Sequence, residues 1–169
     1  MLRSFTTFGM LLVLAAWAGA QGKPVLSTAD QLRMLQTDRS LLGTLLDDGL
    51  SLATAESTVA KADGCRRMTR TLVDALGRAA GDNDADRTVE LGEHLEAVIR
   101  DALAPTLDEA RGLIPDDSPE GRKLKQIRAK SVEDVNTAVA AIPDTGKVGD
   151  HARVRQTRDR LEMLKDRLK

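Results

Sequence analysis

The residues best able to hold a metal ion lie in the stretch Glu90-Leu91-Gly92-Glu93-His94. Glu90 and His94 are four positions apart, so on a helix they would share one face and could contact one ion. A stable site needs three or four ligands, and the only other histidine, His151, lies outside any such motif. Glu90, Glu93 and His94 are therefore weak metal candidates, a surface ion pair is the favoured interpretation, and no cofactor is predicted.

Cys65 is the only cysteine, which excludes a disulfide within the chain. It falls on an apolar stripe between Ala62 and Thr69, and this position favours a small buried hydrophobe. Two alternatives remain open. The thiol could form an intermolecular disulfide in an oxidising compartment, or Arg66 and Arg67 could make it reactive if it were exposed.

The segment from Asp82 to Asp86 contains three aspartates and one asparagine, as calcium-binding loops do. Such a loop also needs glycine at its sixth position and glutamate at its twelfth. Counted from Asp82, these positions hold Arg87 and Glu93, so only the second requirement is met. Turn chemistry is the better explanation of these acids.

Catalytic groups are scarce in this sequence. It has two histidines, one cysteine and no tyrosine, and we find no Ser/His/Asp set and no glycine-rich phosphate loop. Because active sites draw on these residue types, we expect no enzymatic activity. The segment 150–168 is basic, but acidic residues interleave with the basic ones. It is therefore interpreted as a solvated face, with an anionic membrane or polymer as the alternative partner.

The N-terminal 20 residues have the layout of a secretory signal peptide. Arg3 precedes the apolar run Phe8–Ala18, and Ala18-Gly19-Ala20 supplies the small residues that signal peptidase accepts. The apolar run is shorter than the roughly 20 residues of a membrane span. We expect cleavage after Ala20, a flexible leader over 21–26, a secreted or periplasmic location and no stable membrane span.

Composition narrows the possible partners. Phe5, Phe8 and Trp17 are the only aromatic residues, so the chain after Ala20 has none. Base stacking therefore has no platform, and no nucleic-acid partner is expected. Removing Arg3 from the 25 basic residues leaves 24 against 26 acidic ones, a nearly balanced charge that indicates no polyanion partner.

Apolar residues recur at helical spacing throughout the rest of the chain, and we find no alternating pattern typical of strands. A first helix is predicted from Ser27-Thr28 to about Ala55, with a break at Gly49 as the alternative. An αα-hairpin over 59–113 is predicted to form the core, with Gly81 in a left-handed turn and Asn83 or Asp84 capping its second helix.

Pro105 predicts a kink near 101–104 in the second helix of that hairpin. Two further helices are predicted at the periphery, over 119–142, after the Ser118-Pro119 start signal, and over 150–168, whose narrow apolar seam has coiled-coil-like spacing. The predicted fold is all-α: a single domain over 27–169, built as a bundle of about five helices.

Three short segments resemble those of small, uncharacterised exported helical proteins of environmental bacteria. They are Ala62-Asp63-Gly64-Cys65, Glu90-Leu91-Gly92-Glu93-His94-Leu95 and Ala110-Arg111-Gly112-Leu113-Ile114-Pro115. The resemblance covers about half of the chain after Ala20, and it implies export and a helical fold but no known activity. The turn at Gly81-Asp82 also resembles those of tetratricopeptide helix pairs, but no second copy occurs at a fixed period.

These observations predict an exported, non-enzymatic protein that acts as a structural or adaptor module, through an unknown protein partner or self-association. The alternative is a periplasmic metal- or ligand-responsive protein that uses Glu90, Glu93 and His94.

Overall fold

The computed structural model describes the backbone of residues 28–168, and the side chains of Gln36 and of residues 38–168. The predicted signal peptide and leader lie outside this range. The chain divides into two compact units, Met1–Thr37 and Asp38–Lys169, and the second holds the features below. The elements are α1 (Thr28–Ala53), α2 (Thr58–Gly81), α3 (Ala85–Val98), the π-helical turn η1 (Ile99–Leu103), α4 (Ala104–Leu113), α5 (Pro119–Ala141), α6 (Gly146–Gly149) and α7 (Ala152–Leu168).

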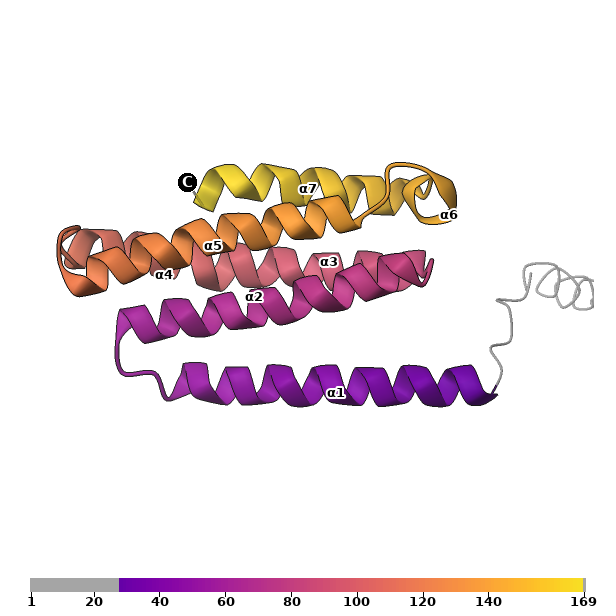
Figure 1. Ribbon diagram of the computed structural model, residues 1–169, viewed down its shortest axis with the longest axis horizontal. Coiled ribbons are helices and arrows are strands. Elements are labelled where there is room, and N and C mark those ends of the chain that lie inside the picture. Colours follow the sequence, from indigo (N-terminus) through magenta and orange to yellow (C-terminus); the bar gives the residue numbers. More distant parts are fainter. Residues whose placement is uncertain (1–27, 169) are drawn as a thin grey trace, which may run out of the picture. The chain divides into compact units, whose positions relative to one another are not determined.

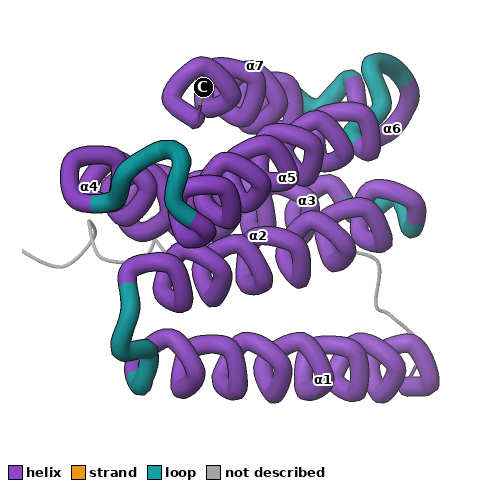
Figure 2. Tube along the Cα trace, turned by 60° about the vertical axis from the view of Figure 1, so that its left-hand side comes forward, coloured by secondary structure: helices purple, strands orange, loops and turns teal. Residues whose placement is uncertain are grey.

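The core of the second unit lies among α2, α3, α5 and α7 (Figure 1). α2 packs against α3 and α5, and α7 packs against the same two helices, so α2 and α7 lie diagonally across the bundle. Short loops join successive helices (Figure 2). No strand occurs in the described residues. The predicted all-α bundle of about five helices is confirmed.

The stripe predicted for α2 is the face that the helix buries. Ser57 caps the helix, since its Oγ accepts a hydrogen bond from the Ala60 N–H at 3.1 Å. Beyond the cap, Cys65, Leu72 and Leu76 are at most 2% exposed. Spacings of seven and four residues place them on one side of the helix, where α3 and α5 cover them.

The turn between α2 and α3 differs in one respect from the prediction. Gly81 is the last helical residue and has no positive φ; Asn83 takes the left-handed conformation, at φ 59°. The predicted left-handed Gly81 is therefore wrong. Asparagine tolerates this conformation better than most residues because its short polar side chain bonds locally. Asp84 caps α3 as predicted, accepting from the Arg87 N–H at 3.0 Å.

Pro105 acts through a π-helical turn. The Ala104 N–H donates to the Ile99 carbonyl, five residues back, and the α-helical pattern resumes beyond it. The Thr106 hydroxyl donates to the Ala102 carbonyl at 2.7 Å. A π turn is wider than an α turn and so makes room for the proline ring. Pro105 predicted where the helix is irregular, near 101–104, but not that the irregularity is a π-helical turn.

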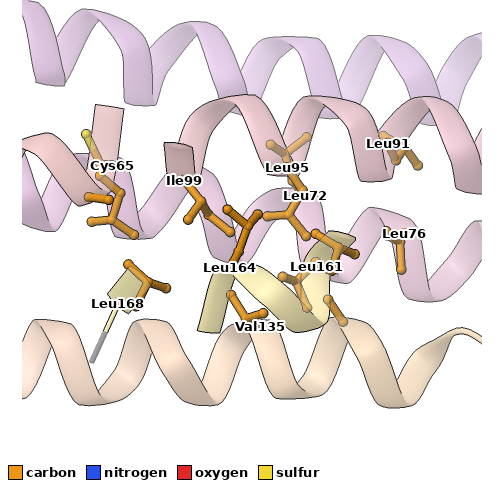
Figure 3. Packing of buried hydrophobic residues seen from close by; sticks show 14 of the residues in the cluster. Cys65, Leu72, Leu76, Leu91, Leu95, Ile99, Val135, Leu161, Leu164 and Leu168 are labelled. Carbon is orange, nitrogen blue, oxygen red and sulfur yellow. The ribbon is translucent and has the colours of Figure 1, made fainter. Parts of the chain in front are cut away.

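α5 and α7 contribute to the core, although the sequence suggested peripheral helices. Leu161 and Leu164 of α7 lie beside Val135 of α5 and Leu95 of α3 (Figure 3). The narrow seam of α7 suffices because α3 and α5 enclose it from two sides. α6, a single turn that precedes α7, was not predicted.

α3 and α7 approach each other closely at Gly92. A Cβ added there would overlap the Thr157 Cγ2 methyl, and Thr157 itself is 1% exposed. Only glycine leaves room for the threonine at this crossing. The contact widens the buried face of α7 beyond its leucines.

Candidate functional site

Of the three candidate metal ligands on α3, Glu90 and His94 lie close to each other, whereas Glu93 does not join them. His94 Nε2 lies 3.9 Å from Glu90 Oε1, and both side chains are more than half exposed. Glu90 also contacts Arg87 at 2.7 Å. Among residues whose side chains are described, no three His, Cys, Asp or Glu side chains lie close enough to hold a metal ion together.

Glu93 turns toward α7 rather than toward His94. Its Oε1 lies 3.4 Å from an Arg153 nitrogen and 3.8 Å from one of Arg160. Arg160 also meets Glu96 at 2.8 Å. The acids of α3 thus balance part of the basic charge of α7, and the sequence missed this pairing because the partners lie about 60 positions apart.

Cys65 lies in the core, 1% exposed. Burial raises the pKa of its thiol, and hydrogen bonding, including that with Thr106, lowers the pKa by less. Because the thiolate is the nucleophile, this environment suppresses reactivity. Arg66 and Arg67, the predicted activators, form ion pairs with Asp63, Asp134 and Asp48.

A buried carboxylate joins α2 to α5. Asp134 is 5% exposed, and its two oxygens lie 3.5 Å from an Arg66 nitrogen and 3.1 Å from an Arg70 nitrogen. The bond with Asp134 is the largest cause that raises the pKa of Arg70. Both oxygens of the buried carboxylate meet an arginine of α2, so the cluster is a structural tie between two helices.

One shallow depression, of about 290 Å³, lies between α4 and the start of α5. Leu107, Ala110 and Leu124 line it together with several cations. Two of these cations face acids, since Lys125 meets Asp116 at 2.9 Å and Arg128 meets Asp108 at 3.5 Å. The depression therefore offers no convergent set of unused polar groups for a small ligand.

The most unusual surface is the outer side of α1, which carries three exposed leucines. Leu42, Leu46 and Leu50 are 58%, 72% and 67% exposed, and we call these three residues the leucine face. Spacings of four residues place them on one side of the helix. Leu41 is 8% exposed, and Leu45 and Leu52 pack against the core, so the buried leucines occupy the adjoining side of the helix.

Polar contacts hold this part of α1 on the bundle. The Asp48 carboxylate accepts a hydrogen bond from Arg67 Nε at 3.2 Å, and another nitrogen of Arg67 donates to the Ser51 hydroxyl at 2.9 Å. Asp38 meets Arg87 of α3 at 2.6 Å. These bonds join this part of α1 to α2 and α3, on the same unit against which Leu45 and Leu52 pack.

No known protein family, no curated protein and no solved structure matches this chain. Among the helices described, none has a segment both long and apolar enough to cross a bilayer. No relative indicates a site, so the candidate must come from the surface of the chain itself. The leucine face is that candidate, because contiguous exposed apolar residues are unusual on an ordinary polar exterior.

Proposed function

We propose that this is an exported helical-bundle protein that acts by protein–protein contact, without catalysis, as a structural or adaptor module. The contact surface in this proposal is the leucine face of α1. The observation that carries it is the exposure of Leu42, Leu46 and Leu50 on a helix whose adjoining side already packs on the core.

Energetics support a role in binding. Fully burying one leucine side chain contributes about 1.5–3 kcal/mol, so three leucines in a row form a substantial apolar anchor. Single exposed apolar residues are common on protein surfaces, but a contiguous stripe usually marks a contact site. Two chemical observations add support. Glu93 points away from Glu90 and His94, which leaves only two candidate metal ligands together, and the single thiol is buried.

Photo-crosslinking in the native host tests the proposal. A photoreactive amino acid is placed at Leu46, and in a matched control at Asn136, which is exposed on α5. We expect a discrete crosslinked product from position 46 only, and its loss when Leu42→Glu is added. Equal labelling from both positions, or none from either, would refute a contact role for this face.

Export is the second part of the proposal, supported by the signal-like layout of the first 20 residues. Mass spectrometry of the chain recovered from the envelope or the medium should give a mature form that begins at Gln21. A full-length chain confined to the cell interior would contradict export, and would leave the contact role to be judged by crosslinking.

A further inference from the structure

The part of α1 that belongs to the second unit, residues 38–53, buries little of its surface, and we call it the arm. Only Leu41 is buried among its residues, all of which the structure describes, whereas α2 buries eleven of its 24 residues. The close approach of α2 to α3 and α5 has no counterpart at α1. Gly43 and Gly49 weaken the helix further, and a Cβ added at either would meet no atom within 4 Å. The arm is therefore packed less firmly than α2.

Three leucines on one side of the arm make its apolar contact with the bundle, and we call them the anchor leucines. They are Leu41, which is 8% exposed, and Leu45 and Leu52, which are only partly buried. Leu52 lies over Gly64 of α2, where an added Cβ would be 3.4 Å from its Cδ1. Because apolar stabilisation follows the area removed from water, these three side chains hold the arm less strongly than the many buried residues hold α2.

Two arginines of the bundle hold the arm through its acids. Arg67 of α2 lies 3.2 Å from Asp48 and donates to the Ser51 hydroxyl at 2.9 Å. Arg87 of α3 lies 2.6 Å from Asp38. Both arginine side chains are partly exposed, and partly exposed ion pairs contribute little to stability. These contacts can therefore break without complete unfolding.

Each of these arginines also has an acid on its own helix. Arg67 lies 2.9 Å from Asp63, four residues earlier in α2, and Arg87 lies 2.7 Å from Glu90, three residues later in α3. Because both pairs lie within one helix, they persist when the arm leaves. An unpaired charge is the costly result of breaking a buried ion pair, and the bundle avoids it here.

The connection between α1 and α2, residues 54–57, has the bonding of a hinge. On one side the Thr54 N–H donates to the Leu50 carbonyl at 3.1 Å, within the end of α1. On the other side Ser57 accepts from the Ala60 N–H, within the start of α2. Rotation at Glu56, between them, breaks neither bond. Both helix ends therefore stay intact when the arm turns about this hinge.

We propose that the arm undocks from the bundle as one unit, turning about the hinge, with the contacts of Arg67 as its latch. Undocking carries the anchor leucines out with the arm, which then presents apolar side chains on two adjoining sides instead of the leucine face alone. The docked form is the major one, because minor conformers of this kind are populated at about 0.1–10%. The inference goes beyond the proposed contact function and does not depend on it.

Hydrogen exchange of the purified protein, followed by mass spectrometry, tests the undocking. The amides of 41–53 should be at least about 100-fold less protected than those of 72–79 in α2, because a released helix with two glycines melts in water. Val135→Ala, a change in the core of the bundle, should lower the protection of 72–79 at least about tenfold. It should leave 41–53 within about twofold, because undocking does not disturb that part of the core.

The latch is tested by Arg67→Gln, which should lower the protection of 41–53 about threefold to tenfold. Arg153→Gln is the matched control. It removes another exposed ion pair between helices, that of Arg153 in α7 with Glu93 in α3, and should leave the exchange of 41–53 within about twofold.

Tethering the arm separates undocking from melting in place. Asp38 and Arg87 meet at 2.6 Å, so a short bis-maleimide linker can join cysteines in the variant Asp38→Cys/Arg87→Cys, made in a Cys65→Ala background. The linker then holds one end of the arm and the hinge holds the other. The linked form should protect 41–53 at least about tenfold more than the unlinked form of the same variant.

Three results would overturn the inference. Equal protection of 41–53 and 72–79, or an equal loss in Val135→Ala, would show that the arm leaves only on complete unfolding. Unchanged exchange after linking would show that the helix melts in place. Unchanged exchange in Arg67→Gln would show that Arg67 is not the latch. None of these results bears on crosslinking from position 46, so the contact function is judged separately.

Discussion

Replacing Gly92 by alanine tests the close approach of α3 and α7. The new methyl group would overlap the Thr157 Cγ2 methyl, inside the 3.4 Å at which ordinary carbon contacts begin. Overpacking of this kind costs about 1–3 kcal/mol. The better helix propensity of alanine offsets about 1 kcal/mol of that cost, so a net loss of up to about 2 kcal/mol is expected.

Thermal unfolding followed by far-ultraviolet circular dichroism measures this loss. For a domain of this size 1 kcal/mol corresponds to about 4 °C, so the Tm of Gly92→Ala should fall by up to about 8 °C. Thr157→Ser removes the obstructing methyl, and the double variant Gly92→Ala/Thr157→Ser should recover at least half of the loss. A double-mutant cycle then isolates the contact between the two positions.

Gly77 provides the matched control. It also lies inside a helix, but its added Cβ would sit 3.7 Å from the Ala141 Cβ, an ordinary contact. Gly77→Ala should therefore raise the Tm by about 2–4 °C, from about 0.5–1 kcal/mol. If Gly92→Ala is as stabilising as Gly77→Ala, the close crossing of α3 and α7 is wrong.

Three further predictions concern the remaining polar groups. Asp134→Asn should destabilise the protein by about 1–2 kcal/mol in urea unfolding. This is less than the loss expected for a fully buried ion pair, because the arginine partners of Asp134 are partly exposed. Asp74 pairs with Arg70 on the exposed side of α2 and serves as the control, so Asp74→Asn should cost at most about 0.5 kcal/mol. Cys65 should react with a thiol reagent only at the rate of unfolding, and fast labelling of the folded protein would contradict its burial. Calorimetry with zinc should show no binding tighter than about 10 µM, because Glu90 and His94 supply only two ligands while Glu93 pairs with Arg153. His94→Ala is the control if heat is released.

Periodicity predicted most of the helices because one face of each helix is buried. The stripe through Cys65, Leu72 and Leu76 required only spacings of seven and four, and the cap at Asp84 required only a local hydrogen bond. Such local features are encoded within a few residues of one another and can be recognised without the fold.

The leucine face was not predicted, because the helical spacing of apolar residues was interpreted as marking one buried side on each helix. Leu41 and Leu42 are neighbours, as are Leu45 and Leu46, and adjacent residues on a helix point about 100° apart. One member of each pair must therefore leave the buried side. Paired leucines at a four-residue interval were the signal in the sequence that could have revealed two apolar faces.

The other misses depend on long-range packing. Asp134 finds its arginine partners 64 and 68 positions earlier in the chain, so no local pattern marks it. The role of Gly92 likewise follows from the helix that passes beside it. The width of the apolar seam on a helix does not show whether the helix is peripheral or central. The width that a helix needs depends on how many other helices pack against it.

The crossing at Gly92 also has a consequence for how the helices are aligned along their length. The core side chains near it are aliphatic, and methyl groups can interlock at more than one axial offset with little change in buried area. A glycine opposite a buried threonine fits at one offset only, because a shift by one turn would bring Leu95 or Thr88 against Thr157. This single contact therefore fixes the axial register of α7 on α3. The leucine contacts alone would define that register only loosely.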